Sequence, residues 1–244
     1  SLLRRRSRDE LLHIARRPAV LSLLVGAMAA ASSIHADTIE LSDIASDSND
    51  GGFAMDGPAT FIFAGTSVSR VGDLNGDGLA DFAVGAPLSN VNGTSSGTTY
   101  VVFGKSGGAA VSLANVQGGT GGFAIHGRAY SQAGDSVSAA GDVNGDNLGD
   151  LVIGAPAATP NGATSGAAYV VFGKSSGTAV LLTDVANGAG GFVMNGIAAT
   201  DRAGDAVAGA GDVNGDGRGD VIVGAYRRDA NGTDSGAAFV VFGK

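Results

Sequence analysis

Residues 73–81 read Asp-Leu-Asn-Gly-Asp-Gly-Leu-Ala-Asp, and nearly the same stretch returns at 142–150 and at 212–220. The opening Asp residues of the three copies are 69 and 70 positions apart. In every copy a Phe-Gly-Lys tripeptide follows, and its Gly lies 31 positions after the opening Asp. Self-similarity at a fixed period is typical of repeat proteins, whose units stack to bury a continuous core.

Short apolar runs bounded by Gly, Asn, Asp or Pro recur inside each copy, and such runs predict β-strands rather than helices. A fourth strand per unit is predicted at 111–116 and 180–185. The other expected strands are 67–71, 81–86 and 99–103 in the first copy, 136–140, 150–155 and 168–172 in the second, and 206–210, 220–225 and 238–242 in the third.

About four strands per repeat make one small antiparallel sheet, and a sheet with two apolar faces has to pack against its neighbours. Radial repetition of such sheets gives a β-propeller, whereas a parallel β-helix would need repeats closer to about 20 residues. We therefore predict an all-β fold of β-propeller blades, with repeats at about 53–122, 123–191 and 192–244.

The composition agrees with a turn-rich folded protein. Of the 244 residues, 42 are Gly, and the chain contains no Cys. The absence of Cys excludes disulfides, thiolate nucleophiles and thiolate metal sites. With 44% hydrophobic and 16% charged residues, the chain does not have the composition of a disordered protein.

The first 36 residues differ from the rest of the chain. Six Arg residues precede or flank the apolar run 19–31, and small and polar residues follow as far as Ala36. This order is typical of a secretory signal peptide, and the run is too short to span a bilayer, which takes about 20 residues. We expect cleavage near Ala36 and a secreted or cell-surface protein. The remaining chain has 9 basic and 21 acidic residues, a formal charge of −12, which disfavours nucleic-acid binding.

The acidic loops are the candidate functional sites. Positions 1, 3, 5 and 9 of each loop carry carboxylate or amide oxygens, and position 7 offers a backbone carbonyl. Oxygen ligands in a flexible loop without His or Cys favour Ca²⁺ over transition metals, and Mg²⁺ demands tighter octahedral geometry. The predicted ligands of about three Ca²⁺ ions are Asp73, Asn75, Asp77, Leu79 and Asp81, then Asp142, Asn144, Asp146, Leu148 and Asp150, and finally Asp212, Asn214, Asp216, Arg218 and Asp220.

Two alternatives to this type of calcium site fit the loops less well. Asn-Gly and Asp-Gly hairpin turns would need no metal, but turns alone do not require three Asp and one Asn at fixed spacing three times. Helix-loop-helix calcium sites need a bidentate acid at position 12, where this chain has Val84, Ile153 and Val223. Asn147 takes the place of Gly at position 6, where a positive φ is expected, and Asn tolerates that conformation.

Together with Gly85-Ala-Pro87 and Gly154-Ala-Pro156, the loops resemble the FG-GAP repeat of integrin α-subunit propellers and of many bacterial secreted proteins. The resemblance covers residues from about 53 to 244 and implies that each loop joins two strands of a blade and binds Ca²⁺. This chain departs from the pattern at Ala64-Gly65 and its two copies, where the family has Phe-Gly, and at Gly224-Ala-Tyr226. Neither departure touches an expected ligand.

The family's propellers usually close with seven blades, so three repeats imply a partial ring and a piece of a longer protein. Residues 38–44 resemble 179–185, and we expect 37–52 to hold an N-terminal closing strand. In the 244-residue chain that strand would be a spare edge, which favours self-association.

The function that we expect is that of a non-catalytic adhesion module that binds a protein or a glycan. The alternative is the accessory propeller of a secreted hydrolase such as a phospholipase. Ser106 and Ser175 formally match a serine nucleophile motif but repeat with the blade, and His126 is the only His after the signal segment. We interpret Arg218-Gly-Asp220, an integrin-recognition tripeptide, as a coincidence, because Asp220 is position 9 of the third loop.

Overall fold

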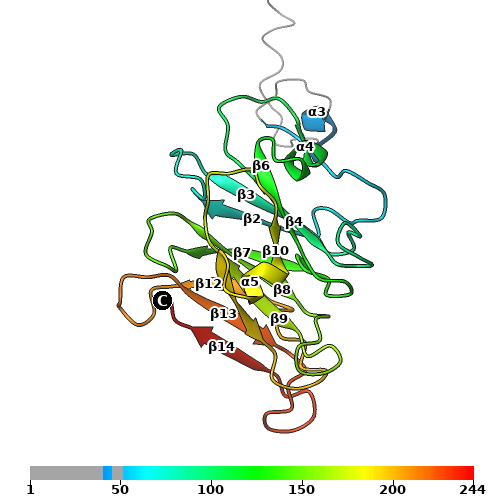
Figure 1. The fold of residues 1–244 in the computed structure, drawn as a ribbon, viewed down its shortest axis with the longest axis vertical. Helices are drawn as coiled ribbons and strands as arrows, with labels where there is room; N and C mark the ends of the chain where they lie inside the picture. Colours follow the sequence, from blue (N-terminus) through cyan, green and yellow to red (C-terminus); the bar gives the residue numbers. More distant parts are fainter. Residues whose placement is uncertain (1–40, 46–51) are drawn as a thin grey trace, which may run out of the picture. The chain divides into compact units, whose positions relative to one another are not determined.

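The computed structural model describes residues 41–45 and 52–244 (Figure 1). The chain divides into two compact units, 1–50 and 51–244. In the first unit the described part is the helix α3 (Leu41–Ala45). The predicted signal peptide at 1–36 lies outside the described residues. Among the described residues, no helix has the length and apolar character needed to cross a bilayer.

In the second unit three larger sheets follow one another along the chain, and a separate two-stranded sheet accompanies the first of them (Figure 1). We call the three larger sheets blades 1 to 3, and their consecutive neighbours pair in antiparallel fashion. In order from one edge, blade 1 consists of β2 (Ser67–Gly72), β3 (Asp81–Ala86), β4 (Thr98–Val102) and β6 (Gly122–His126), blade 2 of β7 (Ser136–Gly141), β8 (Asp150–Ala155), β9 (Ala167–Val171) and β11 (Gly191–Asn195), and blade 3 of β12 (Val207–Gly211), β13 (Asp220–Ala225) and β14 (Ala237–Val241).

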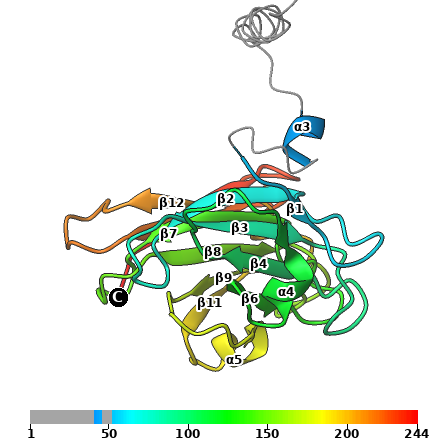
Figure 2. The same ribbon diagram turned by 90° about the horizontal axis from the view of Figure 1, so that it is seen from above.

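The nine strands expected in the three copies are thus confirmed to within a residue at each end. Three repeats folded as small antiparallel sheets fit β-propeller blades, and the described residues form no closed ring. The strands β2, β7 and β12 lie side by side along one side of the stack, whereas β6 and β11 lie on the opposite side (Figure 2).

The prediction of the fourth strand was wrong. Residues 111–116 form only the two-residue strand β5 (Val111–Ser112), followed by one helical turn, α4 (Leu113–Gln117). In the next repeat β10 (Val180–Leu181) precedes α5 (Leu182–Ala186) in the same way. The real fourth strands are β6 and β11, in the Gly-Gly-Phe segments that come after these helices.

The short strands β5 and β10 pair outside their own blade. β10 lies parallel to β6 of blade 1, with Val180 opposite Ile125, and β5 lies parallel to β1 (Met55–Asp56). The connection from the third to the fourth strand of a blade therefore reaches back toward the preceding blade. In α5 this places Leu182 and Val185, three residues apart and both buried, on one face of the helical turn.

The predicted N-terminal closing strand is only partly open to comparison, because residues 37–40 and 46–51 lie outside the described ones. The described part of it, Leu41–Ala45, is helical rather than extended. The sequence likeness between 38–44 and 179–185 is still informative, since the matching residues of the second repeat also form a short helix. In the described part, Leu41–Ala45, the segment is thus helical like its counterpart in the second repeat, and the strand predicted there was wrong.

Neighbouring blades are held together by apolar clusters and by a few hydrogen bonds between the first strands of the blades. Between blades 1 and 2 the buried residues include Phe123, Leu151 and Ile153, and burial of one such side chain stabilises the fold by about 1.5–3 kcal/mol. The backbone N–H of Val137 donates to Ser67 Oγ over 2.9 Å, and Val207 N–H donates to Ser136 Oγ over 3.1 Å. The first strands of neighbouring blades, β2 against β7 and β7 against β12, thus pack in the same register at both contacts.

Candidate metal-binding loops

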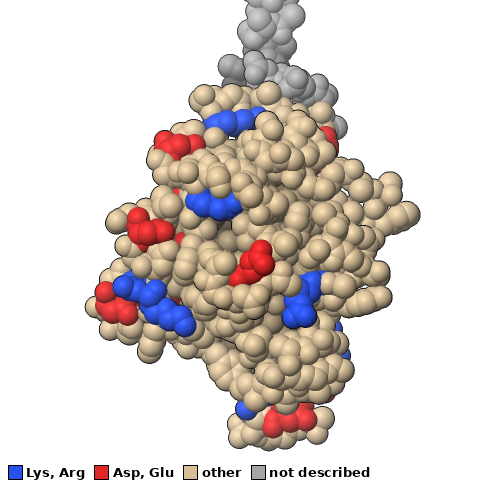
Figure 3. All heavy atoms as spheres, in the orientation of Figure 1, with Lys and Arg blue, Asp and Glu red and all other residues tan. Residues whose placement is uncertain are grey.

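The three acidic loops occupy equivalent places, because each joins the first strand of a blade to the second. They connect β2 to β3, β7 to β8 and β12 to β13, and Figure 1 shows them one below another on the same side of the stack. In the same orientation, Figure 3 shows separate acidic patches along that edge of the molecule. The fold therefore presents the loops as three individual sites in a row.

The Asp at position 1 organises the loop through its backbone. In the first loop Asp73 Oδ1 accepts the N–H of Gly76 over 2.7 Å and that of Asp77 over 3.1 Å, and its Oδ2 accepts the N–H of Gly78 over 2.8 Å. These bonds, that of Gly78 foremost, hold the pKa of Asp73 below its usual value. The corresponding bonds are present at Asp142 and Asp212.

Positions 3 and 5 face each other across the same turn. Asn75 Oδ1 accepts the N–H of Asp77 over 2.9 Å, and Asn75 Nδ2 donates to Asp77 Oδ2 over 2.9 Å. Asp77 Oδ1 accepts the N–H of Leu79 at position 7 over 2.8 Å. The second and third loops repeat this set with nearly the same distances. The oxygens of positions 1, 3 and 5 are thus gathered on one exposed turn.

Position 9 has a different environment, which the sequence did not reveal. Asp81, at the start of β3, is 0% exposed, and its two oxygens accept the N–H of Leu74 over 2.8 Å and the N–H of Gly104 over 2.7 Å. Asp150 and Asp220 are equally buried and make the same pair of bonds. This Asp ties the acidic loop to the end of the third strand, so the Arg218-Gly-Asp220 tripeptide has a buried Asp.

Burial and neighbouring charge disfavour the ionised form of the Asp81 and Asp150 carboxyl groups. Burial, opposed by the two backbone hydrogen bonds and reinforced by the charges of Asp146 and Asp142, raises the pKa of Asp150 to about 6. The pKa of Asp81 is raised for the same reasons, with Asp77 and Asp73 as the charged neighbours. The first and second loops therefore carry unfavourable negative charge that a bound cation would offset.

The backbone at position 6 is confirmed to be left-handed. Asn147 has a φ of 68°, and the glycines at the same position, Gly78 and Gly217, have φ values of 85° and 86°. This conformation turns the N–H of position 6 onto the carboxylate of position 1. An Asn at this place costs less than a β-branched residue would.

The loops do not form a closed metal cage. Across residues 41–45 and 52–244, no three acidic or imidazole side chains converge closely enough to hold an ion between them. The donor set still suits a hard cation, since positions 1, 3 and 5 present oxygens alone, on one solvent-exposed turn. The predicted position 9 ligands are turned inward onto backbone donors, and the assignment of all fifteen residues as ligands stays a prediction.

A search of protein-family models matches the repeats directly. The FG-GAP repeat model matches residues 64–102, 133–171 and 203–241, which run from just before the first strand of each blade to the end of the third. This repeat-containing part defines the class of the chain as a protein with β-propeller blades.

The chain is also similar to curated integrin α chains. It is 34% identical to "Integrin alpha-2" of Mus musculus over 92 residues, which cover 37% of this chain and 7% of that protein. It is 28% identical to "Integrin alpha-4" of Xenopus laevis over 159 residues, which cover 65% of this chain and 14% of that protein. The chain thus spans a small part of the length of these relatives. The chain contains three FG-GAP repeats and is similar to integrin α chains.

Proposed function

We propose that each acidic loop binds one Ca²⁺ and that the three ions stabilise the blades. The observation that carries this proposal is the crowding of oxygen ligands at positions 1, 3 and 5, beside a buried carboxylate whose hydrogen bonds come from backbone N–H groups. The pKa of Asp150, raised to about 6, reflects burial together with that crowding. Asp73, Asn75 and Asp77 would supply side-chain oxygens in the first loop, and Leu79 its carbonyl.

The role of such an ion would be structural. Each loop leaves the innermost strand of a blade, and the buried Asp at its end accepts a hydrogen bond from the Gly of the Phe-Gly-Lys tripeptide, for example Gly104. An ion in the loop would therefore fix the first, second and third strands of the blade relative to one another. Repeat proteins couple mainly through neighbouring units, so we expect three nearly independent sites.

We further propose that the chain is a non-catalytic, secreted adhesion module that binds a protein or a glycan. Binding residues of repeat folds are concentrated in loops held by a rigid scaffold. The loops that lead into β2 and β7, at the opposite strand ends from the acidic loops, expose large aromatic side chains. Phe61 is 83% exposed, Phe63 59% and Tyr130 66%. Exposed aromatic groups of this kind are typical of binding surfaces.

The described residues support a non-catalytic role. His126 is buried in β6, where burial lowers its pKa and its Nδ1 lies 3.2 Å from Thr98 Oγ1. Ser106 and Ser175 are exposed in turns that follow β4 and β9. A Ser nucleophile needs a general base, and neither Ser has the His126 imidazole as its partner.

Thermal unfolding tests the calcium proposal. Free Ca²⁺ at about ten times the dissociation constant contributes roughly 1.4 kcal/mol per site, so three independent sites give on the order of 4 kcal/mol. We expect the Tm of the full chain to be clearly higher in millimolar Ca²⁺ than in excess chelator. An unchanged Tm would contradict the proposal.

Binding and export need separate experiments. A glycan array and a panel of immobilised secreted proteins, probed with the full chain in Ca²⁺, should give hits that are weakened in a Phe61→Ser/Tyr130→Ser double variant with an unchanged Tm. Hits that survive both substitutions would place the binding surface elsewhere. For export, the mass of the secreted chain should correspond to cleavage near Ala36, and a chain retained in the cell at full mass would argue against a signal peptide.

A further inference from the structure

Blades 1 and 2 contain the same cavity. The blade 1 pocket has a volume of about 220 Å³, and the blade 2 pocket one of about 250 Å³. Both are bounded by the end of the third strand, by the connection that holds β5 or β10, and by the turn before the fourth strand. Each residue that lines the blade 1 pocket has its counterpart 69 positions later in the lining of the blade 2 pocket. The repeat thus builds the cavity as well as the strands around it.

Contact with a neighbouring blade leaves the pockets open. Gly177, in the connection of blade 2, lies so close to blade 1 that a Cβ built on it would be 2.1 Å from the carbonyl oxygen of Gly119. The blade 1 pocket, whose lining includes Thr120 and Gly121, is open beside this contact. The blade 2 pocket, whose lining includes Ala179, is open beside it as well. The space therefore belongs to each blade and persists when the blades pack together.

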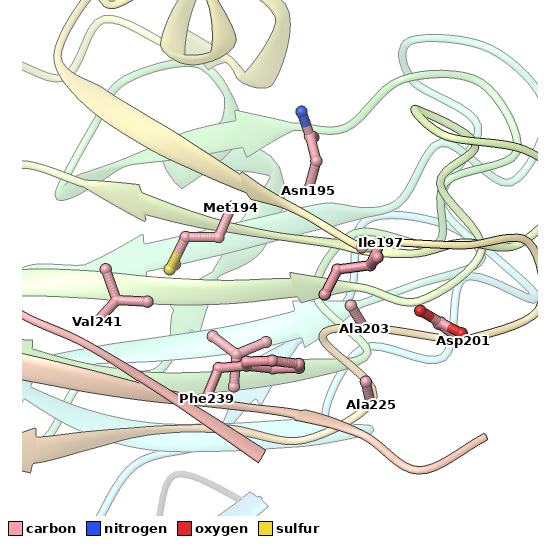
Figure 4. A pocket seen from close by; sticks show the side chains of 10 residues that line it. Met194, Asn195, Ile197, Asp201, Ala203, Ala225, Phe239 and Val241 are labelled. Atoms are coloured by element: carbon pink, nitrogen blue, oxygen red, sulfur yellow. The ribbon is translucent and has the colours of Figure 1, made fainter. Parts of the chain in front are cut away.

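A third cavity is of another kind. It has a volume of about 170 Å³, and Figure 4 shows Met194, Phe239 and Val241 around it. At the positions that correspond to Met194 and Phe239 one repeat earlier, Ile125 and Tyr169 are 1% and 4% exposed. The described residues of blades 1 and 2 thus enclose no copy of this cavity, whereas the blade 1 and blade 2 pockets are features of the repeat.

A partly exposed aromatic ring lines each of the two repeated pockets, and a second ring holds it in place. In blade 2 the ring centroid of Phe172 lies 6.4 Å from that of Phe192, and the two rings meet edge to face. In blade 1 the rings of Phe103 and Phe123 are 5.9 Å apart and tilted. Because the ring is already fixed, a ligand that packs against it loses less entropy on binding.

Polar groups of two kinds line the same pockets. The ammonium group of Lys174 lies 4.3 Å from the ring centroid of Phe123 and donates to a backbone carbonyl four residues further on, and Lys105 is held in the same way. An ammonium group has three N–H donors, so donors are left for a ligand. The other polar position is Asp184 in blade 2 and Asn115 in blade 1, both exposed. Each pocket therefore offers a donor on one residue and an acceptor oxygen on another.

This combination favours a neutral ligand that is rich in hydroxyl groups. A hydroxyl group donates and accepts, so it can pair with the Lys and with the oxygen of Asp184 or Asn115. A carboxylate ligand would meet Asp184, and the chain, with a formal charge of −8, repels polyanions as a whole. A sugar unit combines hydroxyl groups with an apolar C–H face that can pack against the ring of Phe172. The pockets are smaller than the roughly 300–1,000 Å³ of drug-sized sites, which suits a single unit.

We propose that the blade 1 and blade 2 pockets each bind one unit of a neutral polysaccharide. The proposal rests on the binding function proposed above and specifies the type of glycan and the site. A polymer presents the same group at intervals, just as the chain presents the same pocket in successive repeats. Occupation of two pockets by one polymer raises the apparent affinity about 10²–10⁴-fold over a single pocket when the polymer spans both.

The pockets lie at the opposite strand ends from the exposed Phe61 and Tyr130. Gly104 and Gly173, which line the pockets, donate their N–H groups to the buried Asp at the end of the acidic loop in the same blade. Substitutions in the pockets and substitutions at Phe61 and Tyr130 therefore test two separate surfaces.

The first test measures binding of the full chain, in millimolar Ca²⁺, to immobilised dextran, mannan and galactan, with polygalacturonate as the acidic polymer. We expect binding to at least one neutral polymer that is at least about tenfold tighter than to polygalacturonate. The variant Asn115→Ala/Asp184→Ala should bind at least about tenfold more weakly. The matched control Ser106→Ala/Asn187→Ala changes two exposed polar residues outside the pockets and should bind like the parent.

Three results would overturn the proposal: binding to none of the neutral polymers, equal binding of the pocket variant and the parent, or tighter binding to polygalacturonate. The proposed binding function fails separately. If the chain binds immobilised proteins through Phe61 and Tyr130 but binds none of the polymers, that function stands and the pocket proposal falls.

The second test locates the bound sugar without a substitution. In an NMR titration with a soluble hexasaccharide of the polymer that binds, the backbone amide signals of Gly104 and Gly173 should shift, and those of Phe61 and Tyr130 should not. Unshifted signals of both glycines would overturn the proposal, wherever else in the chain shifts occur.

Discussion

Gly154 of blade 2 lies directly against the backbone carbonyl of Gly204 at the start of blade 3. A Cβ built on Gly154 would be 1.9 Å from that oxygen, well inside any real contact. Gly154 belongs to the Gly-Ala-Pro segment of its repeat, and Gly204 to the Ala-Gly segment that stands in place of Phe-Gly. These two segments of the repeat pattern thus mark the place where adjacent blades touch.

Replacement of Gly154 by Ala should push blades 2 and 3 apart. We expect Gly154→Ala to destabilise the chain by about 1–3 kcal/mol or more, because the clash is with backbone that cannot turn aside. Gly224→Ala, where the nearest atom is 3.5 Å away, should change the free energy of unfolding by only about 0.5 kcal/mol. Urea unfolding at a concentration where the chain is monomeric provides the comparison. Equal losses in the two variants would mean that the contact is not close.

A second link between blades 1 and 2 involves a cation and a ring. Lys174 Nζ lies 4.3 Å from the ring centroid of Phe123, and Lys105 and Phe53 repeat the arrangement at the same distance. Lys174→Gln should therefore cost about 0.5–1 kcal/mol. A double-mutant cycle with Phe123→Leu isolates the pair, and a coupling energy of zero would show that the Lys contributes nothing through the ring.

The sequence predicted the strands that pair within their own repeat. It missed the segments whose structure depends on pairing with another blade. β2, β3 and β4 pair within one repeat, and their short apolar runs between turn residues are unambiguous. The run at 180–185 looks equally like a strand, but only Val180 and Leu181 find an edge, which β6 of the preceding blade supplies. From Leu182 onward the segment forms a helix, and no local signal reveals that change of partner.

The acidic loops show the same limit. Their turn geometry follows from local sequence, and the positive φ of Asn147 was predicted correctly. The buried position of Asp81 was not, because its partner Gly104 lies 23 residues away and reaches it only through the pairing of β3 with β4. The spacing between the opening Asp and the Phe-Gly-Lys Gly, equal in all three repeats, was the available signal for this contact.

The raised pKa of Asp150 predicts a pH dependence of stability without calcium. In the unfolded chain the pKa returns to 3.8, whereas in the folded protein it is about 6. At pH values between 3.8 and about 6 the folded state binds this proton and the unfolded state does not. The contribution of Asp150 to stability is therefore fully present below pH 3.8 and is lost as the pH rises through about 6.

The variant Asp150→Asn separates the titration of Asp150 from that of His126. Burial lowers the pKa of His126, which makes stability fall as the pH drops below 6.5, an effect of opposite sign. The difference in Tm between the parent and Asp150→Asn, measured in chelator across the same window, therefore reports on Asp150. A difference that does not vary with pH would mean that the carboxyl group titrates normally.

Substitutions at position 5 should remove the ions one at a time. Asp77→Ala, Asp146→Ala and Asp216→Ala each change a residue whose side chain hydrogen-bonds within its own loop. We expect each variant to bind two Ca²⁺ with affinities close to those of the parent, and Asp184→Ala, outside the loops, to bind three. Three ions bound to any one of the loop variants would show that its loop is not a site.

The most direct measurement of the central claim is the number of Ca²⁺ ions that the full chain binds in a calorimetric titration. Three repeats carry three loops with the same hydrogen-bond pattern, so the stoichiometry should be three per chain, and the bound ions should protect the blades against thermal unfolding. A titration that shows no binding at millimolar Ca²⁺ would contradict the account and leave the acidic loops as turns that are closed by their own hydrogen bonds.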